Sequence, residues 1–367
     1  MTEPQPGERV VVAMSGGVDS SVAAALLVEA GYDVIGISMR LWSGASDSGC
    51  CSLDDFLDAR QVAARLRIPF YVMDFRDAFT RNVVDPFVSE YAQGRTPNPC
   101  VRCNQFVKFR SFWQRARELG AQWLATGHYA RVCRDPVTGH TQLWAAADAA
   151  KDQSYFLFAI EPEVLARTIF PIGELTKTEV RARAQALGLR VASKPESQEV
   201  CFTPKGKYAA FVAQHAAAVS GGPGTAAGVI VDEAGRVLAQ HDGIHQFTIG
   251  QRRGLRLNAG RPLYVTAIEA ETGTVRVGPR AATLAAGLVA HGANWLAGAP
   301  VANGAHLAVK IRSRFAATLV TINAATREGF ELRAERGLSA VTPGQAAVLY
   351  DGPRVVGGGW IERALLA

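Results

Sequence analysis

Residues 9–21 read Arg9-Val10-Val11-Val12-Ala13-Met14-Ser15-Gly16-Gly17-Val18-Asp19-Ser20-Ser21, and this stretch decides the fold. Its apolar, β-branched start is typical of a buried strand over 9–14, and the composition of 20–30 predicts a helix. The two glycines between them allow a tight turn that can approach a ligand closely. Backbone N–H groups of such a turn and of the helix N-terminus bind anions. The stretch therefore predicts a strand, a phosphate-binding loop and a helix, with serine hydroxyls as further donors.

Strands and helices alternate outward from this loop. Further strands are predicted over 34–41, 70–75 and 123–126, and helices over 52–66 and 106–119, the first with Ser52 as N-cap and Asp55 three residues on. Such alternation predicts a parallel sheet covered on both faces, so the N-terminal half is expected to have an α/β fold.

The second half of the chain has a different pattern. Short apolar stretches separated by glycines and turn residues predict antiparallel β structure in one or two small barrels. The stretches are 228–231, 247–249, 263–268, 274–277, 306–312, 318–322 and 346–350. With a linker at Ser220–Thr225 and a second break near 278–284, we expect a catalytic domain over 1–220, a small central domain over 221–282 and a C-terminal β-barrel over 283–367.

Composition excludes several classes of protein. Of 367 residues, 48% are hydrophobic and 20% charged, which is typical of an ordered globular protein. No apolar run reaches the roughly 18 residues of a membrane span. The polar N-terminus has no signal-peptide core, so a cytoplasmic protein without a membrane partner is expected. Lys and Arg exceed Asp and Glu by 39 − 33 = 6, which permits a polyanionic partner.

The loop lacks the lysine of kinase-like phosphate loops. It resembles instead the SGGxDS loop of the ATP-pyrophosphatase superfamily, whose members cleave ATP between the α and β phosphates and adenylate a carbonyl oxygen. Asp19 is unusual beside bare phosphate, and a bound Mg²⁺ would explain it. ATP and Mg²⁺ are therefore the expected cofactors.

Three cysteines indicate the chemistry. The prolines of 94–104 predict an extended loop that presents Cys100 and Cys103, and Cys201 lies about 100 residues on. A thiolate can carry a persulfide, so sulfur could replace an adenylated oxygen. Half of a zinc site would need a second ligand pair that the sequence lacks, and the position does not resemble a thioredoxin helix start. Cys50, Cys51 and Cys133 are assigned no role.

At this point the whole chain resembles one family, the bacterial tRNA-specific 2-thiouridylases. The resemblance rests on 13–21, 94–104, 125–129, 151–156, 201–202, 250–255 and 342–345, which run in family order. It implies an N-terminal ATP-pyrophosphatase domain, a small central domain, a C-terminal β-barrel, and ATP-dependent 2-thiolation of the wobble uridine in tRNAs for Lys, Glu and Gln. A tRNA anticodon loop and a sulfur-donor protein, a cysteine desulfurase or a relay, are the implied partners of a monomeric enzyme.

The resemblance also implies roles for individual residues. ATP would contact Ala13, Met14, Ser15, Gly16, Gly17, Val18, Asp19, Ser20, Met39 and Gly127. Cys201 would carry the persulfide, and Cys103 would attack it, releasing sulfide or closing a Cys103–Cys201 disulfide. The flipped target base would lie against Asn98, Pro99 and Cys100. Other tRNA contacts would come from His128, Lys151, Asp152, Gln153, Arg312, Ser313 and Gln345.

One departure from the family leaves two mechanisms open. Some members have Asp in place of Cys100, whereas this chain has three thiols, Cys100, Cys103 and Cys201. Three thiolates can hold a [4Fe–4S] cluster with one iron open to sulfide. A persulfide relay and cluster-bound sulfide are both consistent with the sequence, and the relay is favoured because other members have only two of these cysteines.

Two competing functions also remain. The first is another ATP-pyrophosphatase that adenylates RNA or a small metabolite, which would need none of the three cysteines. The second is a non-catalytic tRNA-binding or sulfur-carrier protein, against which the intact Ser15–Ser21 loop argues. Basic side chains for RNA are expected from Lys108, Arg110, Arg115, Arg117, Arg252, Arg253, Arg256, Lys310, Arg312 and Arg314.

Overall fold

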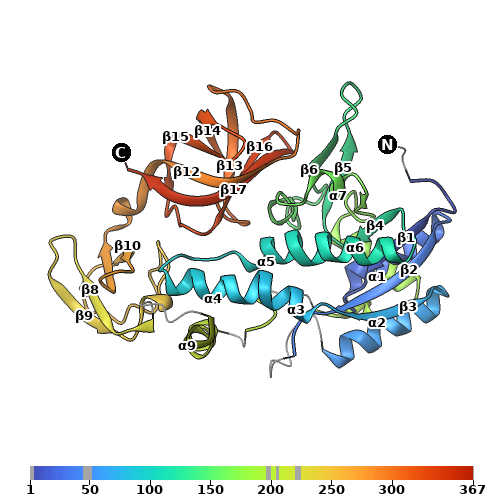
Figure 1. Ribbon diagram of the computed structural model, residues 1–367, viewed down its shortest axis with the longest axis horizontal. Coiled ribbons are helices and arrows are strands. Elements are labelled where there is room, and N and C mark those ends of the chain that lie inside the picture. The colour runs from blue at the N-terminus through green and yellow to red at the C-terminus, as the bar shows by residue number, and fades with distance from the viewer. Residues whose placement is uncertain (1–3, 44–51, 196–199, 204–205, 220–224, 367) are drawn as a thin grey trace.

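The structure is a computed structural model that describes residues 4–43, 52–195, 200–203, 206–219 and 225–366. Figure 1 shows a parallel sheet with its helices at one end, and the central domain and the barrel at the other. Cys50, Cys51 and most of the predicted linker at 220–225 lie outside the described residues. None of the helices in the described part is long and apolar enough to cross a membrane.

The N-terminal sheet is parallel throughout, as predicted. Its strand order is β3-β2-β1-β4-β7. Val10 and Val12 of β1 pack into one core with the helices α1 (Val18–Glu29), α2 (Leu53–Leu66) and α8 (Lys177–Ala186). Val11 packs on the opposite face with α4 (Asp85–Ala92) and α6 (Phe112–Glu118). This alternation along one strand explains why helices cover both faces. The strands are β1 (Arg9–Ala13), β2 (Asp33–Arg40), β3 (Phe70–Asp74), β4 (Trp123–Thr126) and β7 (Thr168–Ile169).

The helices include several that the local sequence specifies clearly. Ser52 and Asp55 form a capping box at the start of α2, as predicted, and Thr176 and Glu179 form another at α8. The helices are α1 (Val18–Glu29), α2 (Leu53–Leu66), α3 (Arg76–Phe79), α4 (Asp85–Ala92), α5 (Pro99–Arg102), α6 (Phe112–Glu118), α7 (Pro162–Leu165), α8 (Lys177–Ala186) and α9 (Tyr208–Val219), with π-helices η1 (Thr80–Val84) and η2 (Cys103–Ser111) and 3-10 helices η3 (Ser154–Phe156) and η4 (Arg190–Ser193).

The prediction of an extended loop over 94–104 is wrong from Pro99 onward. Pro99 is the first residue of α5, and helix continues through η2 and α6 to Glu118. A proline at the first helical position costs nothing, because the N–H that it lacks would have no partner there. Cys100 therefore lies in a helix, and Cys103 begins the π-helix that follows it.

The central domain has a mixed sheet. Its strands run in the order β10-β11-β8-β9, and β8 pairs in parallel with β11, so the prediction of purely antiparallel pairing is wrong here. The predicted strand at 247–249 is also absent among the described residues, because Phe247 follows the 3-10 helix η6 (Ile244–Gln246) and packs into the small core. The strands are β8 (Gly228–Val231), β9 (Val237–His241), β10 (Tyr264–Glu269) and β11 (Thr274–Gly278).

The C-terminal strands close into an antiparallel barrel, as predicted. The order is β12-β15-β14-β13-β16-β17, and pairing of β12 with β17 closes the ring. The hairpin of β5 (Ala130–Arg134) and β6 (Thr141–Ala145) extends this sheet through β17. The N-terminal part of the chain and the barrel thus share one sheet. The barrel strands are β12 (Leu284–Trp295), β13 (His306–Lys310), β14 (Thr318–Ala325), β15 (Gly329–Ser339), β16 (Ala346–Asp351) and β17 (Arg354–Leu365), and η7 (Arg280–Thr283) precedes β12.

Candidate functional site

The loop after β1 has the tight geometry that its glycines predict. Gly16 has a φ of +71°, and a Cβ there would lie 2.2 Å from the carbonyl oxygen of Asp55. Only glycine fits this position. The Ser20 hydroxyl accepts from the Ser15 N–H at 3.1 Å and donates to the Gly17 carbonyl, to which the Ser21 hydroxyl also donates at 2.8 Å. The last two serines of the loop therefore shape the turn itself.

A cavity of about 330 Å³ opens over this loop, at the carboxyl ends of β1, β2 and β4. In a parallel sheet this is where ligands bind. Four lysines and two aspartates line it, so its charge is net positive and suits a polyphosphate. The lining residues are Ala13, Met14, Ser15, Gly17, Val18, Asp19, Ser20, Met39, Leu41, Asp55, Lys108, Thr126, Gly127, His128, Tyr129, Lys151, Gln153, Lys177, Lys194 and Pro195.

Most of the residues expected to contact ATP meet at this cavity. All of them line it except Gly16, which turns the chain and contacts α2. Gly127 is equally constrained, since a Cβ there would lie 2.6 Å from the backbone nitrogen of Ser20. The end of β4 thus approaches the start of α1 closely. His128, Lys151 and Gln153, expected as tRNA contacts, line the same cavity.

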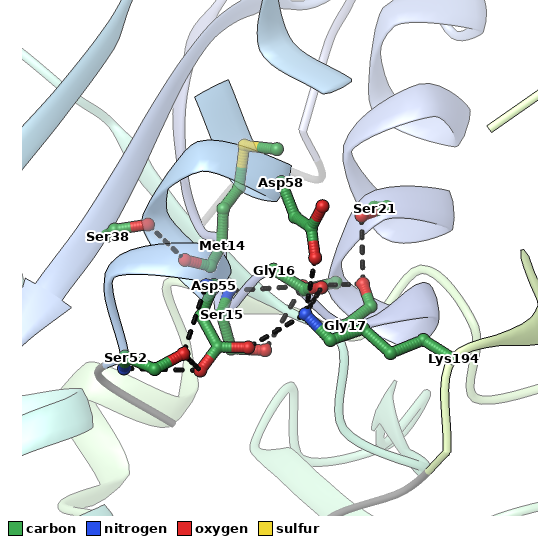
Figure 2. A network of polar contacts seen from close by, with 11 residues as sticks. Met14, Ser15, Gly16, Gly17, Ser21, Ser38, Ser52, Asp55, Asp58 and Lys194 are labelled. Atoms are coloured by element: carbon green, nitrogen blue, oxygen red, sulfur yellow. Dashed lines mark hydrogen bonds and ion pairs between the residues drawn. The ribbon is translucent and has the colours of Figure 1, made fainter. Parts of the chain in front are cut away.

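Lys194 ties the loop to α2, as Figure 2 shows. Its ammonium donates to the Gly16 carbonyl at 3.1 Å, to Asp55 at 2.8 Å and to Asp58. Partial burial disfavours the charge of Lys194, but the two carboxylates outweigh it, so the pKa of Lys194 is raised. The Lys194 ammonium therefore stays charged at physiological pH and lies against the backbone of the loop at Gly16. In the same network the Ser38 hydroxyl donates to the Met14 carbonyl.

Lys177 explains why an aspartate occurs in an anion-binding loop. The Lys177 ammonium lies 2.7 and 2.8 Å from the two carboxylate oxygens of Asp19, and the Tyr129 hydroxyl donates to the same carboxylate at 2.8 Å. The Lys177 side chain is only 11% exposed. Asp19 thus holds the Lys177 ammonium at the cavity wall, and the expected Mg²⁺ beside Asp19 stays a prediction.

His128 follows the end of β4, between the rings of Phe109 and Phe170. Its Nδ1 lies 2.8 Å from the Thr126 hydroxyl. Burial, and next the ammonium of Lys108, lower the pKa of His128 to about 3. The imidazole is therefore neutral at physiological pH and carries no charge toward a phosphate.

The segment 151–154 presents side chains in two directions. Lys151 and Gln153 line the cavity, and the Gln153 amide oxygen accepts from the Tyr129 N–H at 2.8 Å. Asp152 instead pairs with Lys310 of the barrel at 3.2 Å and is 6% exposed. Its carboxylate is already bound within the protein, so its expected contact with tRNA stays a prediction.

The three cysteines differ in exposure. Cys100 is exposed, Cys103 is buried and Cys201 is half-buried. Cys103 belongs to the main core, and Cys201 packs against that same core. Within the described residues no group of three or more His, Cys, Asp or Glu side chains could hold a metal ion. As placed, the three thiols therefore do not form a cluster site.

The π-helix that begins at Cys103 contains two further unusual side chains. The amide oxygens of Asn104 and Gln105 are buried without a hydrogen-bond partner, although the Asn104 nitrogen donates to the Phe156 carbonyl at 3.1 Å. Turns of π-helix are rare and occur frequently at functional sites. Lys108 of the same helix reaches the cavity, so this helix connects the cysteine segment to the phosphate loop.

The barrel residues expected to touch tRNA lie apart from the cavity. Arg312 follows β13, and its guanidinium donates to the carbonyls of Ser339 and Ala340. The Gln345 side chain donates to the carbonyls of Thr96 and Pro97. Ser313 lies in the turn after Arg312. The expected contacts of Arg312, Ser313 and Gln345 with RNA therefore stay predictions.

Sequence reasoning missed Lys177 and Lys194. Both line the cavity, but they lie about 160–180 residues after the loop that they contact. The capping box Thr176–Glu179 was a readable signal of a helix start, and it would have placed Lys177 in the first turn of that helix. No local pattern singles out Lys194, because only the fold brings its segment to α2.

Comparisons with known proteins agree along the whole chain. The family described as tRNA methyl transferase HUP domain matches residues 8–205, tRNA methyl transferase PRC-barrel domain matches 219–279, and aminomethyltransferase beta-barrel domain matches 285–361. The tRNA-specific 2-thiouridylase MnmA of Geotalea uraniireducens is 49% identical over 373 residues, covering 100% of this chain and 98% of the relative. The MnmA of Geobacter metallireducens is also 49% identical, covering 100% of this chain and 99% of the relative.

Similarity to one solved structure is much weaker. The NMN synthetase of Francisella tularensis is 17% identical, with a TM-score of 0.35 over 52% of this chain and 67% of that one. A likeness this weak carries no argument about function.

Proposed function

The chain belongs to the family of tRNA-specific 2-thiouridylases, and from that premise we propose that it thiolates C2 of the wobble uridine in tRNAs for Lys, Glu and Gln. The HUP domain of the family uses ATP, and the expected resemblance to this family is confirmed. The observation that carries the proposal is that one positively charged cavity joins the SGGxDS loop to the helix that begins at Cys103.

ATP would bind with its phosphates on the loop. The N–H groups at the start of α1, together with Lys177 and Lys194, would hold the β and γ phosphates and stabilise the pyrophosphate as it leaves. Asp19, at the cavity wall, could share a Mg²⁺ with the phosphates, since Mg²⁺ usually takes one or two carboxylates beside phosphate oxygens. Such an ion would supply further neutralisation of the leaving charge.

The substrate would be activated before sulfur attacks. The uridine C2 carbonyl oxygen attacks the α phosphate of ATP, and the bond to pyrophosphate breaks. C2 then bears AMP, which is a good leaving group. The base must leave the anticodon stack, at a cost of a few kcal/mol. Asn98, Pro99 and Cys100 would contact it, and exclusion of water would prevent hydrolysis of the adenylate.

Sulfur would come from a persulfide on Cys201. Its terminal sulfur attacks C2, and AMP leaves with the oxygen. The Cys103 thiolate then attacks the inner sulfur of Cys201, which breaks the S–S bond and forms a Cys103–Cys201 disulfide that an external thiol reduces. Cys103 is buried in the main core and Cys201 packs against the same core, so both thiols belong to the N-terminal part of the protein. A cysteine desulfurase or a relay protein would reload Cys201, and we expect the enzyme to be a monomer with domains at 1–220, 221–282 and 283–367.

The alternative with cluster-bound sulfide fits less well. It requires the thiols of Cys100, Cys103 and Cys201 to converge on one site, and the described residues form no such group. We therefore route no step through a cluster.

The test is formation of 2-thiouridine in unmodified tRNA from ATP and a sulfur source. We expect wild type to form it, Cys201→Ser to form none, and Asp19→Asn to be slow in pyrophosphate release. Pyrophosphate release with no thiolation by wild type, with a competent sulfur source, would favour a different adenylating enzyme.

A further inference from the structure

A turn of the barrel binds the segment that leads to the cysteines. The Gln345 side-chain nitrogen donates to the carbonyls of Thr96 and Pro97, at 3.1 and 2.9 Å. The Thr96 N–H donates to the Pro343 carbonyl at 2.9 Å. Gly344 between them has a φ of +90°, and a Cβ there would lie 2.8 Å from the Thr96 oxygen. The contact is close enough that only glycine fits at its centre.

Thr96 and Pro97 lead directly into the cysteine helix, which we define as α5 and η2 together, with Cys100 and Cys103. Asn98 follows Pro97, and its side-chain oxygen accepts from the Val101 N–H at 3.3 Å, which caps α5. Cys100 is the second residue of this helix, and Cys103 begins the next. Whatever fixes Thr96 and Pro97 therefore also fixes where α5 begins, and with it the positions of Cys100 in α5 and Cys103 in η2.

We propose that Gln345 is a positioning residue, which holds the start of the cysteine helix from the barrel. This inference rests on the proposed function, in which Cys103 takes part in sulfur transfer. It differs from the direct tRNA contact that the family resemblance implies, because both hydrogens of the Gln345 amide are directed to backbone carbonyls of the catalytic domain. The barrel would thereby contribute to the geometry of the thiols as well as to RNA binding.

The chain offers a matched control. The Asn294 side chain, in β12, also donates to two carbonyls of the catalytic domain, those of Phe158 and Ile160, at 2.7 and 2.8 Å. This contact has the same chemistry and also joins the barrel to the catalytic part. The Asn294 contact does not lead into the segment with Cys100 and Cys103. Removing it therefore measures the effect on alkylation of losing any contact of this kind between the barrel and the N-terminal part.

The experiment measures alkylation of individual cysteines by iodoacetamide, followed by mass spectrometry, in the full-length protein without tRNA or ATP. Cys133 is exposed on β5 and serves as the internal reference. Gln345→Met keeps the side-chain length and removes the donor. We expect alkylation of the buried Cys103 to rise about tenfold relative to Cys133, which corresponds to about 1.4 kcal/mol of lost hydrogen bonding. Asn294→Ala should leave this ratio unchanged.

A second variant separates positioning from contact with RNA. Gly344→Ala adds a methyl group that would overlap the Thr96 carbonyl, so it should raise Cys103 alkylation as Gln345→Met does. Both variants should lower kcat for 2-thiouridine formation while the Kd for tRNA stays within about twofold. Unchanged alkylation with weaker tRNA binding would overturn the proposal, and so would an equal rise in Asn294→Ala. If wild type formed no 2-thiouridine, the proposed function would fail, but the alkylation ratios would still test the positioning.

Discussion

The ion pair between Asp152 and Lys310 gives a prediction that separates two roles for a residue expected to touch tRNA. The Asp152 carboxylate accepts from the Ala146 N–H at 3.2 Å, from the Ser154 N–H at 3.1 Å and from the Ser154 hydroxyl at 3.0 Å. It also pairs with the Lys310 ammonium at 3.2 Å. Asp152→Asn would keep one oxygen but would turn an NH₂ group toward the hydroxyl and the ammonium.

The magnitude follows from burial of the pair. Removing one partner of a buried ion pair costs about 3–5 kcal/mol. Asp152 is 6% exposed and Lys310 22%, so the lower end, about 3 kcal/mol, applies. At about 2–4 °C per kcal/mol for a folding unit of 150–250 residues, Tm should fall by roughly 6–12 °C.

The assay is thermal unfolding, combined with tRNA binding below the transition. Asp152→Asn should lower Tm as above and leave the Kd for tRNA nearly unchanged. In a Lys310→Met background the same substitution should cost only about 1 kcal/mol, because the ammonium that opposes the amide is gone. An unchanged Tm together with a large loss of tRNA affinity would refute the structural role and restore direct contact.

Three further predictions concern the loop, a histidine and the RNA. Gly16→Ala should lower Tm, because a non-glycine residue at positive φ costs about 1–3 kcal/mol and its Cβ would meet Asp55. Gly17→Ala is the control and should leave Tm unchanged, because its Cβ would meet only Ser15 Oγ at 3.6 Å. In the folded protein His128 has a pKa of about 3 and is neutral, whereas in the unfolded chain it takes up a proton below about pH 6.5. Because only the unfolded state gains this proton, the free energy of unfolding falls as pH drops below about 6.5. Wild type should therefore lose roughly 1–2 kcal/mol more than His128→Gln between pH 7 and pH 5, and equal losses in pH-dependent unfolding would contradict this. Affinity for tRNA should fall at least about tenfold when salt is raised from about 50 to 200 mM, and a flat response would exclude an electrostatic interface.

Local sequence patterns predicted the parts of the fold that local physics controls. The β-branched run of β1, the capping box at Ser52 and the turn at Gly16 each depend on neighbours within a few residues. The loop predicted around Pro99 was wrong for a local reason as well. A proline breaks a helix when it lies in the helix interior, but it is well tolerated as the first residue of a helix. The sequence alone did not show which of these positions Pro99 occupies.

The remaining part of the site depends on contacts between distant segments. Lys177 and Lys194 become part of the cavity only because α8 and the segment after η4 pack beside α1 and α2. Similarly, Asp152 lies between two cavity-lining residues in sequence, yet it faces the barrel. Family resemblance predicted that this segment matters, but the direction of each side chain is set by packing of the whole molecule.

The most direct test of the persulfide mechanism is a single turnover with iron-free enzyme that carries a persulfide. Protein purified without oxygen would be loaded with persulfide, freed of excess sulfur source and mixed with ATP and unmodified tRNA. The persulfide mechanism predicts one 2-thiouridine, one pyrophosphate and one AMP per persulfide, and a new disulfide between Cys103 and Cys201. If 2-thiouridine formed only after iron was restored, and only with Cys100 intact, the persulfide mechanism would be contradicted.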